Sequence, residues 1–71
     1  MRNIFIPMQL RCARQRAKKT LSQVSDDLNI SVSYLSEIER GCTIPSLKIL
    51  IEMSDYYNLR IDHFFSFFAG G

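Results

Sequence analysis

The sequence predicts an all-α fold, built as one compact domain of five helices over residues 1–71. Hydrophobic residues make up 46% of the chain, which is enough for one small core. Apolar residues recur at helical spacing, as at Val24 and Leu28, and no strand-like alternation recurs. The chain has only three glycines and two prolines, so few positions interrupt a helix. Several short helices are therefore expected.

Residues suited to helix starts define the first two helices. Pro7 suits the first turn of a helix over about residues 7–18, where its missing N–H costs nothing. Thr20 is a suitable N-cap for a helix over residues 21–28, and Gln23 completes a capping box.

The third helix is expected directly after a tight turn. Asn29 suits the left-handed conformation in which a helix often stops, and Ser31 caps a helix over about residues 32–40. Gly41 closes it. Residues 20–41 thus have the layout of a helix-turn-helix, whose second helix enters the DNA major groove.

The remaining residues predict two more helices and an arm. Ser46 caps a helix over about residues 47–57, and Leu47 is expected on its inner face. The last helix is expected over residues 61–68, with aromatic side chains all round it. Residues 1–6 form an N-terminal arm.

The stretch SVSYLSEIERG, followed by PSLKIL, resembles the Cro and phage-repressor family of helix-turn-helix proteins, also called the XRE type. The resemblance covers about Leu10 to Phe65. It implies a lambda-repressor-like DNA-binding fold with double-stranded DNA as partner. It also implies a cytoplasmic transcriptional regulator, encoded by a bacterium, phage or plasmid and acting most commonly as a repressor.

The distribution of charge agrees with a nucleic-acid partner better than the modest net charge of +2 does. Residues 1–40 carry seven Lys or Arg against four acids, and residues 41–71 carry two against three. The N-terminal part is therefore the side expected to face phosphate.

The resemblance places the base-contacting side chains on the third helix. They are Val32, Ser33, Ser36 and Glu37. Valine can meet a thymine methyl, and serine can bond several bases. Glu37 is either a reader of cytosine or a solvated acid that repels phosphate. Because no long amide or basic side chain stands at Val32 or Ser33, bidentate reading is not available there, and shape readout is expected to contribute.

Phosphate contacts are expected around the starts of both helices of the motif. The candidates are Thr20, Ser22, Ser31, Tyr34, Arg40, Thr43, Lys18 and Lys19. Leu21 stands where the family commonly has a phosphate-binding Gln, so this side chain cannot make that contact.

The resemblance also implies a structural ion pair between Arg14 in the first helix and Glu39 near the end of the third. The rival interpretation is that Arg14 binds DNA. The structural role is favoured, because Glu39 would otherwise bring an unpaired acid close to DNA.

The chain has more apolar residues than a domain of this size needs, which indicates an interface. A two-fold homodimer that binds a palindromic operator is expected. Its interface residues are Phe5, Ile49, Ile51, Tyr56, Phe64, Phe67 and Phe68. The alternative is that the segment from Ile4 to Ile6 folds back over the C-terminal aromatics within one chain.

No residue set suggests catalysis, a metal site or a cofactor. Cys12, Cys42 and the single His63 do not make a zinc site, and the two cysteines are expected to be reduced thiols. No signal peptide and no apolar run long enough for a membrane span are found.

Two other functions stay open. The chain could be a protein-interaction module, or an antitoxin-type or controller-type partner protein, that uses the same fold. It could also be the DNA-binding part of a longer regulator, since Gly70 and Gly71 would suit a linker.

Overall fold

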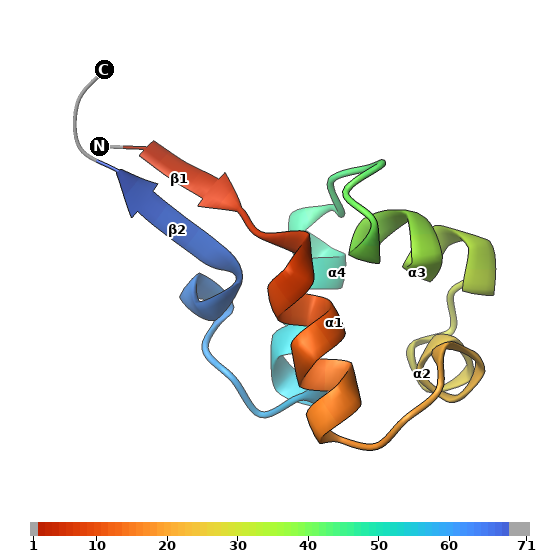
Figure 1. Cartoon of the computed structure of the whole chain (residues 1–71). Helices are drawn as coiled ribbons and strands as arrows, with labels where there is room; N and C mark the ends of the chain where they lie inside the picture. The colour runs from red at the N-terminus through yellow and green to blue at the C-terminus, as the bar shows by residue number, and fades with distance from the viewer. Residues whose placement is uncertain (1, 69–71) are drawn as a thin grey trace.

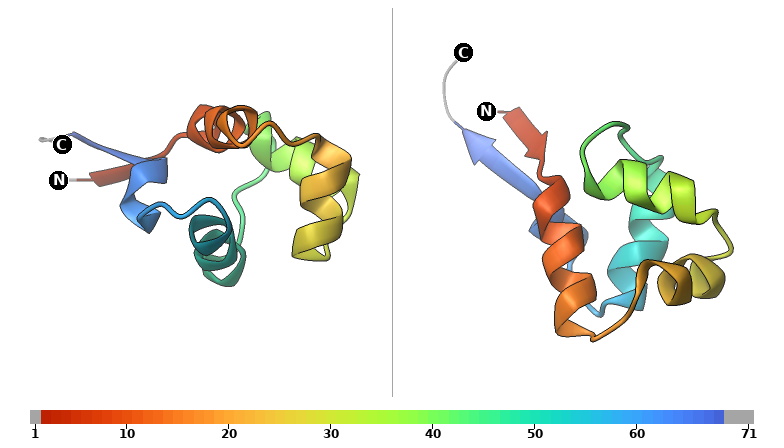
Figure 2. Two further views of the ribbon diagram at one scale, coloured as in Figure 1. Left: turned by 90° about the horizontal axis from the view of Figure 1, so that it is seen from below. Right: turned by 45° about the vertical axis from the view of Figure 1, so that its right-hand side comes forward.

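The computed structural model describes residues 2–68, in which four α-helices form a body and the two chain ends form a short sheet (Figure 1). The elements are β1 (Arg2–Phe5), α1 (Pro7–Arg16), α2 (Leu21–Leu28), α3 (Val32–Glu39), α4 (Leu47–Tyr56), a 3₁₀ turn (Ile61–Phe64) and β2 (Phe65–Phe68). The sheet lies at one end of the molecule and α2 and α3 lie at the other, with α1 and α4 between them (Figure 2).

The prediction of a fifth helix over residues 61–68 is wrong. The chain makes one 3₁₀ turn and then becomes extended at Phe65, with φ −124° and ψ 150°. β2 pairs antiparallel with β1, in a register that sets Phe5 opposite Phe65. Aromatic residues favour strands once a partner strand is available, and the N-terminal arm supplies it. The arm therefore folds back on the C-terminal aromatic segment within one chain.

Local side-chain caps set the starts of the helices as expected. The Thr20 hydroxyl accepts from Gln23 N at 3.1 Å, and Gln23 Oε1 accepts from Thr20 N at 2.8 Å. Ser31 Oγ accepts from Tyr34 N at 3.0 Å, and Ser46 Oγ accepts from Ile49 N at 3.3 Å. Each bond satisfies a backbone donor that the first helical turn leaves free.

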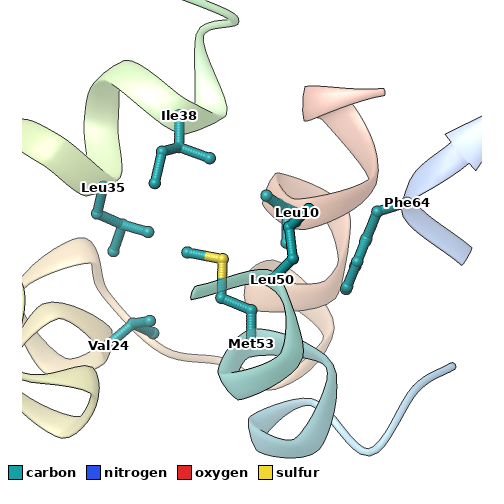
Figure 3. Packing of buried hydrophobic residues seen from close by; sticks show 7 residues of the cluster. All are labelled: Leu10, Val24, Leu35, Ile38, Leu50, Met53 and Phe64. Carbon is teal, nitrogen blue, oxygen red and sulfur yellow. The ribbon is translucent and has the colours of Figure 1, made fainter. Parts of the chain in front are cut away.

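One core joins all four helices and the 3₁₀ turn (Figure 3). Its members are Leu10, Val24, Leu35, Ile38, Leu50, Met53 and Phe64. Each is at most 3% exposed, and burying such a side chain is worth roughly 1.5–3 kcal/mol. Leu47, expected on the inner face of its helix, is instead 66% exposed.

Candidate nucleic-acid interface

The turn between α2 and α3 fixes the direction of the second helix. Asn29 ends α2 in the left-handed conformation, with φ 58° and ψ 44°. Ile30 N then donates to Ser25 O at 3.0 Å, and the Ile30 side chain packs against the core. The turn is therefore anchored both by a backbone bond and by an apolar contact, so α3 leaves it in one defined orientation.

The outer face of α3 is exposed near its N-terminus. Val32 is 45% exposed, and Ser33 and Glu37 are also exposed. These positions and Ser36 share one side of the helix, because residues four apart are neighbours on a helical surface. Leu35 and Ile38 occupy the opposite, fully buried side. The face predicted to contact bases is thus open to a large ligand.

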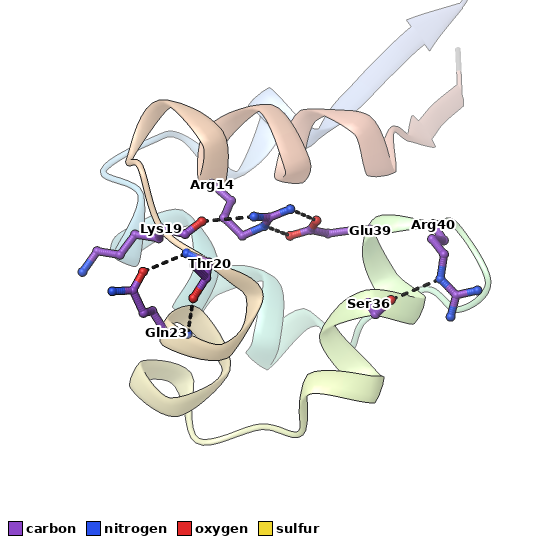
Figure 4. Close-up of polar contacts among 7 residues, drawn as sticks. All are labelled: Arg14, Lys19, Thr20, Gln23, Ser36, Glu39 and Arg40. Atoms are coloured by element: carbon purple, nitrogen blue, oxygen red, sulfur yellow. Dashed lines mark hydrogen bonds and ion pairs between the residues drawn. The ribbon is translucent and has the colours of Figure 1, made fainter.

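Ser36 differs from the other three predicted base contacts. It is half-buried, and its Oγ accepts from Arg40 Nε at 3.2 Å (Figure 4). This bond uses one Arg40 donor and leaves the terminal nitrogens of the guanidinium available. Ser36 is therefore hydrogen-bonded to Arg40, the residue that ends α3.

The predicted phosphate-binding residues differ in their exposure and in the hydrogen bonds that they already make. Lys18, Ser22 and Arg40 are exposed, whereas Tyr34 and Thr43 are half-buried. Thr20 and Ser31 use their hydroxyl oxygens as caps, which leaves each hydroxyl hydrogen free to donate.

Lys19 is held between α2 and α4 by Asp27 and Tyr56. Its Nζ lies 3.7 Å from Asp27 Oδ2 and 5.9 Å from the ring centre of Tyr56. The Tyr56 hydroxyl donates to the same carboxylate oxygen at 2.5 Å. Burial and this hydrogen bond raise the pKa of Tyr56 to about 12. These contacts attach α4 to α2. They also engage the Lys19 ammonium, which was expected to contact phosphate.

Arg14 and Glu39 form a bidentate ion pair between α1 and α3 (Figure 4). Arg14 Nε lies 2.9 Å from Oε2 and Arg14 Nη2 lies 3.0 Å from Oε1 of Glu39. Arg14 Nη1 also donates to Lys19 O at 3.0 Å, which ties the α1–α2 connection to the pair. The hydrogen bond to Glu39 raises the pKa of Arg14. The pair therefore fastens α3 to α1.

A pocket that the sequence did not predict opens beside this ion pair. It has a volume of about 230 Å³ and is lined by Arg11, Arg14, Leu21, Ser36, Glu39 and Arg40. In the sequence Arg11 is only one of several cations on the first helix. Its position three residues before Arg14, and so on the same helical face, is the one signal that could have singled it out.

The predicted dimer interface needs correction. Phe64 is 0% exposed because it fills the core beneath α1, so it is not available to a partner. Phe5, Ile49 and Tyr56 pack partly buried against that core, while Ile51 is 46% exposed.

Two strongly exposed apolar side chains among the described residues lie near the start of α4. Ile44 and Leu47 are 74% and 66% exposed and were not predicted as interface residues. The side chains of Phe67 and Phe68 lie outside the part of the chain that the structure describes in detail.

Among the described residues, no three His, Cys, Asp or Glu side chains come together as metal ligands would. Cys12 is half-buried and Cys42 is exposed, both as free thiols. No described helix is both long and apolar enough to cross a bilayer.

The family model described as helix-turn-helix matches residues 10–64. The chain is 51% identical over 41 residues to the transcriptional regulator ClgR of Mycobacterium tuberculosis H37Rv, covering 58% of this chain and 37% of that protein. It is 38% identical over 53 residues to the HTH-type transcriptional regulator DdrOP3 of Deinococcus deserti, covering 75% of this chain and 41% of that protein. The chain thus spans about two fifths of the length of these relatives.

Proposed function

Because the chain belongs to the XRE-type helix-turn-helix family, we propose that it is a sequence-specific DNA-binding transcriptional regulator, probing the major groove with α3. The observation that carries this proposal is the exposed outer face of α3, on a helix that the Arg14–Glu39 ion pair fastens to α1. A helix presented in this way can enter the groove without rearrangement of the domain.

Direct readout is assigned to three exposed side chains of α3. Val32 meets a thymine methyl, Ser33 bonds a base edge, and Glu37 accepts from cytosine N4. Ser36, the fourth predicted base contact, has its oxygen engaged by Arg40. Three short or acidic readers supply few bidentate contacts, so we expect shape-dependent DNA deformation to contribute to specificity.

The regulator acts as a homodimer on a palindromic operator, and repression is its mode of control. The exposed side chains of Leu47 and Ile51 support a second copy as partner, because they are four residues apart and therefore neighbours on the surface of α4. A two-fold pairing would set the α3 helices about 34 Å apart, which is one turn of DNA.

Selection of bound sequences from a random DNA pool at moderate salt tests this proposal. We expect a palindrome with half-sites one turn apart. Ser33→Ala should relax the preference at one base pair of each half-site, while the matched surface change Ser22→Ala should leave the base preference intact. No enrichment by a folded protein would refute sequence-specific binding.

Glu37 is tested on the selected operator. If Glu37 reads cytosine, Glu37→Gln lowers affinity for the operator and relaxes one position. If Glu37 only repels phosphate, the same change tightens binding to every sequence alike. Glu52→Gln on α4 controls for the change in net charge.

A second candidate function is a protein-interaction module, favoured by the exposed Leu47 and Ile51 on α4 and the short side chains at the front of α3. DNA binding falls steeply with salt, whereas an apolar protein contact does not. Salt-insensitive partner binding that survives Ser33→Ala but is lost in Leu47→Glu would favour this alternative.

A further inference from the structure

We propose that Arg11 and Arg40 together hold one phosphate of the DNA backbone in the pocket between α1 and α3, with the Ser36 hydroxyl as a third donor. This inference rests on the proposed function. Arg40 was already expected to contact phosphate, and the pocket adds Arg11 and the sharing of one phosphate between the two. It also assigns Ser36 to the backbone instead of to a base edge.

The pocket has the right size and position for a single small group. Its volume is about 230 Å³, which is below the roughly 300–1,000 Å³ typical of sites for larger organic ligands. α1 supplies Arg11, and α3 supplies Ser36 and Arg40. The pocket therefore adjoins the recognition helix, and a helix that lies in the major groove is flanked by the phosphates of the two DNA strands.

The charges around the pocket are not balanced. Arg14 is matched by Glu39, which it contacts through two hydrogen bonds. Arg11 and Arg40 are exposed, and no carboxylate among the described side chains lies within ion-pair distance of either. Two unpaired cations thus share one pocket, and an anion between them would remove their mutual repulsion.

The donors are also of the right kind. A guanidinium presents a planar fork that matches two oxygens of a phosphate. Arg40 Nε is bonded to Ser36 Oγ at 3.2 Å, which orients the guanidinium and leaves its terminal nitrogens available. Because Ser36 accepts in that bond, its hydroxyl hydrogen can donate to the same anion. Such a contact fixes the register of α3 on DNA without reading sequence.

The salt dependence of operator binding tests the inference. Arg11→Gln and Arg40→Gln should each weaken operator and unrelated duplex by the same factor and reduce the slope of log affinity against log salt by about one. If one phosphate is shared, the double variant reduces the slope by about one and not two. Arg16→Gln is the matched control, because Arg16 is exposed on α1 outside this pocket.

A second measurement locates the phosphate. Each operator phosphate is replaced in turn by an uncharged methylphosphonate, and affinity is measured for the wild type and for the double variant. We expect one phosphate per half-site whose replacement weakens the wild type but not the double variant. Ser36→Ala should then weaken binding without altering base preference.

The outcomes separate this inference from the proposed function. If the wild type binds a selected operator but Arg11→Gln behaves like Arg16→Gln, the shared phosphate is refuted and the regulator stands. The same holds if no phosphate loses its effect in the double variant. If the folded wild type selects no sequence and binds no duplex, both proposals fall.

Discussion

The substitution Glu39→Gln is expected to lower the stability of the fold, because it breaks the ion pair with Arg14. The side chains of Arg14 and Glu39 are only 14% and 5% exposed, so water screens the pair weakly. Removing one partner of a buried pair leaves an uncompensated charge and costs about 3–5 kcal/mol. Arg14 keeps its bond to Lys19 O and some hydration, which favours the lower end, about 3 kcal/mol. For a domain of this size that corresponds to a fall in Tm of about 12–24 °C.

Thermal and urea unfolding followed by circular dichroism measure this cost. The control is the double variant Arg14→Met with Glu39→Met, which removes both charges while keeping apolar volume, and it should regain most of the lost stability. A loss for Glu39→Gln below about 1 kcal/mol would refute the reasoning, because that is the value of an exposed pair. The double variant also tests the rival role of Arg14. Its salt slope for DNA binding should equal that of the wild type if Arg14 is structural.

Three further predictions concern backbone and tyrosines. Gly41→Ala should lower stability by about 1–2 kcal/mol in urea unfolding, because φ is +78° and the new Cβ would lie 3.2 Å from Pro7 Cγ; an unchanged midpoint would contradict this. Tyr57→Phe should leave Tm unchanged or raise it, since its buried hydroxyl has no partner, whereas Tyr56→Phe should lower it by losing the bond to Asp27; the reverse order would be inconsistent with the structure. Burial raises the pKa of both tyrosines, that of Tyr56 to about 12. The unfolded chain therefore loses these protons near the ordinary tyrosine pKa of about 10, whereas the folded protein keeps them to higher pH. The free energy of unfolding should thus fall as pH rises from about 10 to 12, and it should fall less steeply in the double Phe variant.

Short-range features of the fold could be predicted from the sequence. Thr20, Ser31 and Ser46 each bond a backbone N–H three residues away, so local sequence alone decides where those helices begin. The left-handed Asn29 follows from the same local chemistry. The family resemblance, confirmed by the match over residues 10–64, added the long-range pairing of Arg14 with Glu39 to this picture.

Features that depend on distant partners were decided by the tertiary structure. The segment Phe65–Phe68 suits a helix or a strand, and it became a strand because residues 2–5, from the other end of the chain, pair with it. Phe64, which directly precedes this strand, lies in the core and is 0% exposed. Packing likewise turned Leu47 outward.

The pocket that Arg11 lines shows the same division at the candidate site. The sequence by itself determined that residues 20–41 form a helix-turn-helix with a polar outer face, because caps, turn and apolar spacing act within a few residues. Only the packing of α1 against α3 brought Arg11 to Arg40. Cation clusters of this kind join residues far apart in the chain, and no local pattern encodes which of several arginines will meet.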